Sequence, residues 1–210
     1  MRIAKATPEA IRFACKRFHY SKSVPSVRFG YSVFNAENEW CGVVLYGSGA
    51  NNSIGKPFGL YQGEVLELVR VALNGKQETT SMAVGMTLKE LHRQQPQIKL
   101  IVSYSDLDQD HVGTIYQATN WIYTGIMMQN STDSSWIING KRVHGRVISD
   151  YVRNGGGLKG MTRKEFLQKY YDENATEFIT KGKHKYIFPM NKKMRKKFAH
   201  LAKPYPKKGA

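Results

Sequence analysis

The segment from residue 98 to residue 125 constrains the fold of this chain more than any other stretch. Its first part, residues 98–102, is an apolar run that predicts a buried strand. A polar loop over residues 103–111 follows. Apolar residues at helical spacing then predict a helix over residues 113–121, before Gly125 and another apolar run. This order predicts a βαβ unit, which places ligands beyond the carboxyl ends of its strands. We therefore expect the functional centre at residues 103–111.

The other predicted elements lie on both sides of this unit. Thr7 and Pro8 begin the first helix as N-cap and first helical residue. Asn139-Gly140 predicts a tight hairpin turn, and residues 47–63, rich in Gly, Asn and Ser, predict a long loop. Further helices are predicted over 79–93, 162–171 and 190–201, and further strands over 28–34, 40–46, 64–73 and 136–143. This order predicts an α/β (α+β) fold in which one pair of strands splays and opens a cleft.

Length and composition indicate one domain of ordinary size with an appendage, because the chain has 210 residues. Cys15 and Cys41 have no CxxC spacing, which argues against a disulfide framework or a cysteine-based zinc site and favours a reduced cytoplasm. The sequence has no apolar leader and no run near the roughly 18 apolar residues of a spanning helix. We therefore expect a soluble, cytoplasmic protein with no membrane partner.

Charge is the strongest compositional signal. The chain has 32 Lys and Arg against 16 Asp and Glu, a net charge of +16, and such an excess favours polyanions. Residues 181–210 contain eleven basic residues and no acid. Aromatic residues interleave with these charges, which favours nucleic-acid contact over a tail that only solubilises. We predict that residues 151–210 form a helical, basic extension packed on a 1–150 domain, and that this extension contacts nucleic acid through Lys192, Lys193, Arg195, Lys196 and Lys197.

Asp106 is the first candidate site residue. It directly follows a predicted strand, where a carboxylate serves as a base, a hydrogen-bond acceptor or a metal ligand. The alternative is a loop of solvated aspartates that caps the next helix, and we assign that capping role to Asp110. His111 either contacts the site or a phosphate, or is an ordinary surface histidine.

His19 and Tyr20 follow the first predicted helix. A histidine at this position complements the helix dipole. Together with the Asp106 carboxylate, the imidazole and phenol would instead form a mixed nitrogen and oxygen site. Such a site suits iron or another divalent metal such as zinc, or metal-free acid–base chemistry.

Arg70, Tyr116 and the segment after residue 75 complete the candidates. Arg70 is a lone cation in strand 64–73, with Glu67 on the opposite face by simple alternation, so it has either a structural carboxylate partner or an anionic substrate. Tyr116 is either a core aromatic or a proton donor. Residues 76–85 join a strand to a helix, which predicts either a phosphate-binding corner or a plain helix start capped by Thr79 or Thr80.

Three motifs carry a resemblance to known families. The order of elements and the motif GTIYQATNWIYTG (113–125) resemble the GNAT acyltransferase superfamily. HYSKSVPS (19–26), ELVRVAL (67–73) and SYSDLDQDHVGTIYQATNWIYTG (103–125) together resemble the Mom-type phage DNA-modification proteins. The resemblance covers roughly residues 10 to 150.

The resemblance implies a mixed, mostly antiparallel sheet with helices on both faces and a cleft between splayed strands. It also implies conversion of the adenine N6 to a methylcarbamoyl derivative that protects phage DNA from host restriction endonucleases in an infected bacterium. By motif position His19, Tyr20, Arg70, Asp106 and Tyr116 line the reaction centre. Acetyl-CoA or another acyl-CoA is the implied donor, and the residues placed near its pyrophosphate are Ser81, Gln77 and Thr80. The sequence departs from the GNAT phosphate loop, because residues 77–82 contain no glycine.

Two other functions compete with this interpretation. An ordinary N-acetyltransferase acting on a protein or small-molecule amine would not need the basic C-terminal segment. A non-catalytic DNA-binding protein would bind DNA and leave no modified nucleoside. The sequence leaves the oligomeric state open, with a monomer and a homodimer as the alternatives.

Overall fold

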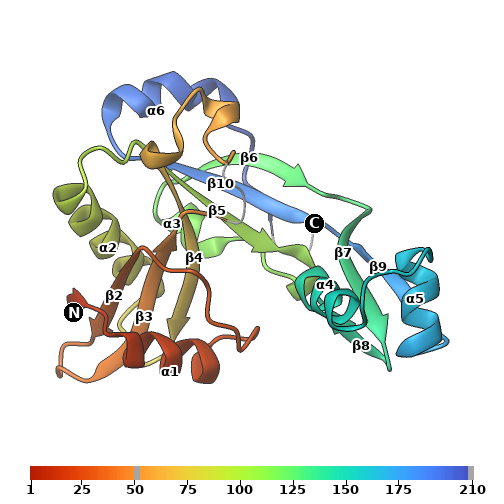
Figure 1. Ribbon diagram of the computed structural model, residues 1–210. Helices are drawn as coiled ribbons and strands as arrows, with labels where there is room; N and C mark the ends of the chain where they lie inside the picture. The colour runs from red at the N-terminus through yellow and green to blue at the C-terminus, as the bar shows by residue number, and fades with distance from the viewer. Residues whose placement is uncertain (50–52, 208–210) are drawn as a thin grey trace. The chain divides into compact units, whose positions relative to one another are not determined.

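The computed structural model describes residues 1–49 and 53–207 except for the side chains of residues 133 and 134, and it divides the chain into two compact units (Figure 1). Unit 1 comprises Met1–Ser105, Val112–Gly125 and the segment from His184 onward. Unit 2 comprises Asp106–His111 and Ile126–Lys183.

Unit 1 is built on a seven-stranded sheet. Its first four strands run in chain order and pair antiparallel: β1 (Arg2–Lys5), β2 (Phe29–Phe34), β3 (Trp40–Gly47) and β4 (Val65–Leu73). β4 then pairs parallel with β5 (Leu100–Asp106), and β10 (Lys183–Pro189) and β6 (Ile122–Met127) complete the order. The expected mixed, mostly antiparallel sheet is confirmed.

β4 and β5 separate after a short ladder. Their register runs over Val65↔Leu100, Leu66↔Ile101 and Glu67↔Val102, whereas β4 continues to Leu73 and β5 to Asp106. The two arrows diverge in Figure 1. The expected pair of splayed strands is therefore present, and it lies between the fourth and fifth strands of the sheet.

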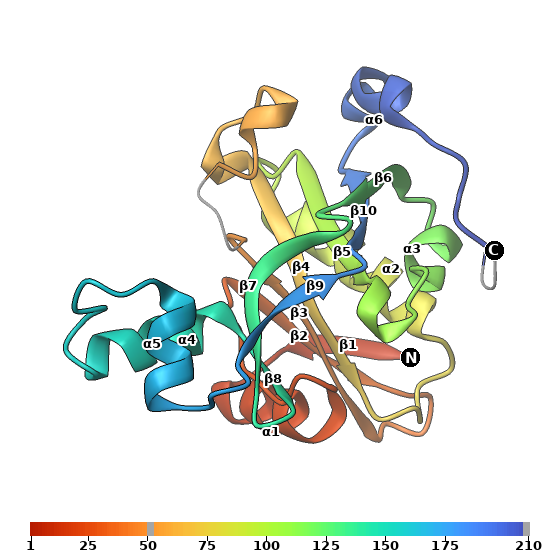
Figure 2. The ribbon, with the colours of Figure 1, turned by 90° about the vertical axis from the view of Figure 1, so that its right-hand side faces the viewer.

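Helices cover both faces of this sheet (Figure 2). α1 (Pro8–Phe18) buries Ala14 and Cys15 in a cluster with Val43, Leu45 and Ala72. α2 (Thr80–Gln94) packs on the opposite face, where Ala83, Val84, Leu88 and Leu91 meet Val44, Tyr46, Leu66 and Leu68. The alternation of β3 residues between the two clusters explains why this strand is apolar on both faces. Both helices begin as the sequence predicts, since Thr7 and Thr79 accept hydrogen bonds from Ala10 N–H and Met82 N–H.

The predicted boundary at residue 150 is wrong. β10 lies between β5 and β6 inside the sheet of unit 1, and its Tyr186 and Ile187 are fully buried. α6 (Lys192–Phe198) follows and packs Met194 and Phe198 against Val65, Leu100 and Ile187. Lysines flank these apolar residues in the sequence, so the segment looks like a basic tail although it completes the core.

Unit 2 contains a three-stranded sheet ordered β8 (Lys141–Val143), β7 (Ser131–Ile138) and β9 (Thr176–Thr180). α4 (Gly145–Asn154) and α5 (Arg163–Tyr170) contribute Ile148, Phe166 and Leu167 to a core with Trp136 and Ile138. The predicted hairpin is confirmed: Ile138 pairs with Lys141, and Asn139 and Gly140 have φ values of 50° and 70°.

Several other boundaries differ from prediction. α3 (Thr114–Ala118) ends before Trp121, and Gly125, at φ 109°, lies inside β6 and does not terminate the helix. β1, β9, β10 and α4 were not predicted, because they are short or flanked by charge. Residues 50–52 of the predicted loop 47–63 lie outside the described residues. No helix among the residues described has the length and apolar content to cross a membrane.

Gly113 offers a test of how β10 holds α3. A Cβ at Gly113 would lie 2.5 Å from the Tyr186 ring and 2.9 Å from the Tyr116 ring, at φ 73°. Gly75 has φ 89° and nothing within 4 Å of such an atom. We predict that Gly75→Ala lowers the free energy of unfolding by about 1 kcal/mol for its left-handed backbone alone. Gly113→Ala should cost about 3 kcal/mol, because the rings must also move. Urea denaturation of both variants checks this, and equal losses would contradict the packing argument.

Candidate functional site

Tyr116 lies where β4 and β5 separate. Ser103 Oγ, on β5, is 2.9 Å from the Leu68 carbonyl oxygen, on β4, and 2.8 Å from the Tyr116 phenolic oxygen. A carbonyl only accepts and the serine has one proton, so Ser103 donates to Leu68 and accepts from Tyr116. The serine hydroxyl therefore continues the connection between the strands after the backbone ladder ends, and it fixes the phenol there.

The Tyr116 side chain is buried among aromatic rings. Its ring centroid is 4.9 Å from that of Tyr186 and 5.0 Å from that of Trp121. Burial, with a contribution from the Glu67 carboxylate, raises the pKa of Tyr116 to about 12. The phenol therefore keeps its proton throughout the physiological range, as a proton donor must.

Arg70 is on a different face of β4 from the one that alternation predicts. The register with β3 shifts between Leu68 and Arg70, which leaves Val69 as an extra residue. Ala72 therefore packs with α1, in a cluster separate from that of Leu68, and the bulge brings Arg70 to the Glu67 face. The prediction that Arg70 and Glu67 occupy opposite faces is wrong, because a bulge is invisible to a period-two pattern.

The guanidinium of Arg70 has polar partners but no acidic one. Nη1 donates to the Val69 carbonyl at 2.9 Å and Nη2 to Ser23 Oγ at 3.0 Å. Nε is buried without a hydrogen-bond partner in the described part of the chain, where no ion pair involves Arg70 either. Among the described residues no carboxylate pairs with Arg70, so the first alternative, a structural partner, has no support there, and anion binding stays a prediction.

His19 and Tyr20 follow α1 as expected. The Ser21 N–H donates to His19 Nδ1 at 3.2 Å, so this nitrogen is an acceptor and the neutral ring carries its proton on Nε2. The two rings lie 4.3 Å apart, and the Tyr20 side chain is 52% exposed. Tyr20 also contributes to the electrostatics of Tyr116. The segment after α1 thus lies in the neighbourhood of the phenol.

Asp106 belongs to unit 2. Its Oδ1 accepts the Asp108 N–H at 3.0 Å and caps the short 3₁₀ turn Leu107–Gln109. The predicted cap, Asp110, has φ 52° and lies 3.6 Å from Lys181 Nζ, while α3 begins after Gly113 with no side-chain cap. The prediction for Asp110 is therefore wrong, and Asp106 performs a capping role one turn earlier. The second carboxylate oxygen of Asp106, Oδ2, takes no part in the hydrogen bond that caps this turn.

Asp108 holds the loop to the sheet of unit 2. Its carboxylate accepts from Thr180 Oγ1 at 2.7 Å, the Lys181 N–H at 2.9 Å and Arg142 Nη1 at 2.9 Å. Burial acts to raise the pKa of Asp108, but the Lys181 N–H, the Thr180 hydroxyl and Arg142 together hold it below its usual value. Asp108 therefore fixes the turn that carries Asp106.

The three residues predicted near a pyrophosphate surround the start of α2. The Gln77 side chain donates to Thr80 Oγ1 at 3.0 Å and accepts from the Gly75 N–H at 3.1 Å, and the Ser81 hydroxyl donates to Thr79 at 3.3 Å. Their polar groups thus bind one another locally. Gly75, directly before this corner, has φ 89°.

The donor set does not support a metal centre. The described residues contain no group of three or more His, Cys, Asp or Glu side chains that could hold a metal ion. His19 Nδ1 is used by the Ser21 N–H, and one Asp106 oxygen by the Asp108 N–H. The interpretation of His19, Tyr20 and Asp106 as iron or zinc ligands therefore has no support from their geometry.

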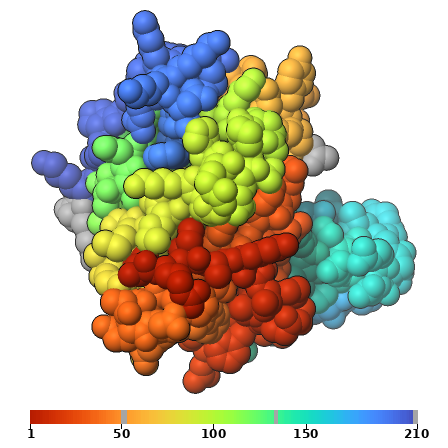
Figure 3. Space-filling view, turned by 90° about the vertical axis from the view of Figure 1, so that its left-hand side faces the viewer, coloured from red at the N-terminus to blue at the C-terminus, as the bar shows by residue number. Residues whose placement is uncertain are grey.

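The basic residues of α6 divide into two groups. Arg195 donates to the Asn120 carbonyl at 2.6 Å and Lys197 to the Phe58 carbonyl at 3.2 Å, so both hold the helix in place. Lys192, Lys193 and Lys196 are exposed and have no ion pair in the part of the chain described here. The C-terminal residues, blue in Figure 3, form a protruding surface at the top of that view.

Unit 1 carries 22 Lys or Arg and 7 Asp or Glu, a net charge of +15, whereas unit 2 has 10 Lys or Arg and 9 Asp or Glu.

The structure brings residues of three distant motifs together in unit 1. Ser23 contacts Arg70, and Leu68 contacts Ser103, which contacts Tyr116. The approach of Asp106 to these residues stays a prediction. The sequence places Ser103 within the expected functional centre but assigns it no role of its own; its signal is a serine directly after an apolar run. The sequence places Glu67 on the wrong face relative to Arg70, because its place depends on the bulge.

We predict that Asp108→Ala lowers the free energy of unfolding by about 3 kcal/mol, because three donors lose a buried acceptor. Asp150→Ala, which breaks the exposed pair with Arg153, should cost below about 0.5 kcal/mol. The lowered pKa means that the contribution of Asp108 is fully present above pH about 4 and fades as the pH falls further. Denaturation at pH 7 and pH 3 measures both effects. Equal losses in the two variants would exclude this role.

Comparison with curated proteins finds no match to this chain. Among solved structures, a spermidine N-acetyltransferase chimera built partly from the Vibrio cholerae protein has 9% identity and a TM-score of 0.49, covering 90% of this chain and 97% of its own. An aminoglycoside 6'-acetyltransferase type Ii has 10% identity and a TM-score of 0.47, covering 91% and 98%. Both TM-scores lie below 0.5, and nothing about this chain's activity follows from them. The family model described as the Mom protein family matches residues 1–207, so this chain belongs to the Mom protein family.

Proposed function

We propose that this protein is a transferase that modifies the exocyclic N6 of adenine in double-stranded DNA to a methylcarbamoyl derivative, and so protects phage DNA from host restriction endonucleases. Membership of the Mom protein family supports modification of DNA. The charge of unit 1, +15, supports a polyanionic substrate.

One observation carries the proposal most. The three motifs that resemble Mom-type proteins are far apart in the sequence, yet the β4 motif contacts both of the others. Arg70 binds Ser23, and the Leu68 carbonyl accepts from Ser103, which also binds Tyr116. These contacts lie where β4 and β5 separate, and they include a buried guanidinium nitrogen without a partner. An anionic group of a substrate would supply that partner.

The mechanism assigns a task to each residue. The adenine must leave the base stack for its N6 to be reached, at a cost of a few kcal/mol. The exposed ring of Tyr20 stacks on the everted base. Asp106 orients or deprotonates the amine through the oxygen outside its turn. As N6 forms a bond to the transferred carbon, the bond from that carbon to the leaving group breaks, and Tyr116 holds a proton for the leaving group. The leaving group is a thiolate if the donor is a CoA derivative that carries the methylcarbamoyl unit on its sulfur. Gln77, Thr80 and Ser81, at the start of α2, would lie near the pyrophosphate of that donor.

DNA is gripped mainly through phosphates. Lys192, Lys193 and Lys196 present free ammonium groups, and contacts of this kind position a duplex without reading its sequence. Arg195 and Lys197 act indirectly, because their hydrogen bonds keep α6 in place.

The first test is the modified nucleoside itself. Asp106→Asn keeps an oxygen that accepts the Asp108 N–H, so the turn should persist, but it removes the negative charge. We predict that adduct in the DNA of bacteria expressing this variant falls at least about 100-fold. Asp110→Asn, in the same loop, should leave the adduct unchanged. Mass spectrometry of digested nucleosides measures all three samples.

The possible results distinguish the role of Asp106 from the proposed function of the protein. Wild-type adduct in the Asp106→Asn sample would remove Asp106 from the site. No adduct in wild-type DNA would remove the proposed function, and turnover of polyamines or peptides with acetyl-CoA would favour an ordinary N-acetyltransferase.

The second test concerns α6. Replacing Lys192, Lys193 and Lys196 by alanine should lower the affinity for duplex DNA. The slope of the logarithm of the binding constant against the logarithm of the salt concentration should become shallower by about 2.7, because three phosphate contacts are lost. Lys5, Lys89 and Lys164 are exposed lysines elsewhere, and their triple alanine variant removes the same charge. Binding titrations at several salt concentrations compare the two. An equal slope in both variants would place the grip elsewhere.

A further inference from the structure

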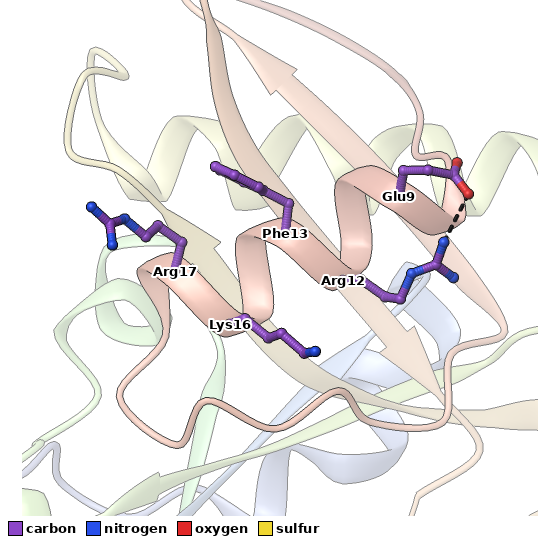
Figure 4. A pocket seen from close by; sticks show the side chains of 5 residues that line it. All are labelled: Glu9, Arg12, Phe13, Lys16 and Arg17. Carbon is purple, nitrogen blue, oxygen red and sulfur yellow. Dashed lines mark hydrogen bonds and ion pairs between the residues drawn. The ribbon is translucent and has the colours of Figure 1, made fainter.

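The outer face of α1 carries an unusual combination of cations and an aromatic ring. Glu9, Arg12, Phe13, Lys16 and Arg17 recur at helical spacing and line a shallow depression (Figure 4). All five project from the side of α1 that faces solvent, opposite Ala14 and Cys15 in the core. We call these five residues the α1 stripe.

Two of the four charged residues of the stripe have no acidic partner among the described residues. Glu9 pairs with Arg12 at 2.9 Å, which leaves Lys16 and Arg17 without an acidic partner among the described residues. Lys22 adds a further cation beside them, since its Nζ donates to the Arg17 carbonyl at 3.2 Å. This local excess favours a phosphate-bearing partner.

Phe13 stands among these cations with 56% of its side chain exposed. Its ring is held by Phe18 at 5.7 Å and Trp40 at 5.8 Å, so it is positioned as well as exposed. Proteins that bind single strands combine aromatic rings, on which bases stack, with cations that hold the adjacent backbone.

The stripe leads to the candidate site. One turn beyond Lys16 and Arg17 the chain reaches Tyr20, which is also exposed, and then Ser23, which binds Arg70. When a base is everted, its neighbours lose stacking partners and the local strand departs from duplex geometry. A cationic and aromatic track that ends at Tyr20 would compensate for that loss.

We propose that the α1 stripe binds the unstacked DNA strand beside the everted adenine, with Lys16 and Arg17 on phosphates and the Phe13 ring on a neighbouring base. This inference rests on the proposed function, and it separates two kinds of contact. α6 holds duplex phosphates, whereas the α1 stripe holds the opened strand.

Binding of a fluorescent single-stranded oligonucleotide to the full-length chain tests the proposal. In the variant Lys16→Ala/Arg17→Ala, the slope of the logarithm of the binding constant against the logarithm of the salt concentration should become shallower by about 1.4, because two contacts to a single strand are lost. Lys89→Ala/Lys164→Ala removes the same charge and should leave the slope unchanged. Phe13→Ala and Phe13→Leu should each weaken binding about tenfold, because both lose the ring and the leucine keeps apolar bulk against Phe18 and Trp40. Circular dichroism and thermal melting establish that each variant is folded.

Each outcome decides the question. If the wild type binds and modifies DNA but the α1 variants retain its slope and affinity, the inference is overturned and the proposed function stands. If Phe13→Leu binds as wild type, the stacking role is excluded. If the wild type neither binds nor modifies DNA, both proposals fall.

Discussion

The separation of β4 from β5 is the constraint on which the candidate site depends. Two parallel strands that stop pairing leave backbone groups without ladder partners, and a buried carbonyl without a partner is costly. The Ser103 hydroxyl satisfies the Leu68 carbonyl and accepts from the Tyr116 phenol, so one side chain both continues the connection between the strands and positions the proposed proton donor. The bulge at Val69 lies just beyond and brings Arg70 and Glu67 to one face. The end of the ladder with β5 and the bulge are therefore adjacent on β4, and both shape the candidate site.

The two units differ in how far their charged side chains are neutralised by neighbouring groups. In unit 2 the buried carboxylate of Asp108 is matched by a cation, a hydroxyl and a backbone N–H, which makes it a structural group. In unit 1 the excess of positive charge has few acidic partners, and the lysines of α6 and the α1 stripe face solvent. Neutralised charge stabilises a fold, whereas unneutralised charge costs self-repulsion and is retained where a polyanion binds.

The basic C-terminal segment illustrates how composition misleads about architecture. Its lysines indicate a nucleic-acid surface, and this remains our functional interpretation. Its aromatic and aliphatic residues, interleaved with those lysines, are nevertheless core: Tyr186 covers Gly113 and packs on Tyr116, and Tyr205 donates to the Trp121 carbonyl. The last strand thus packs against the helix that carries Tyr116, the proposed proton donor.

Sequence alone determined the features that depend on local chemistry. These were the N-caps Thr7 and Thr79, the Asn139-Gly140 hairpin, the mixed sheet with one splayed pair, and the motifs that indicated the family. Tertiary structure decided what depends on distant pairing: the place of β10 between β5 and β6, the bulge that turns Arg70, and the partners of Asp106 and Asp108. Caps and turns are set by hydrogen bonds within a few residues, so a sequence pattern reveals them. Strand order, register shifts and buried partners are set by packing between segments far apart, which no local pattern records.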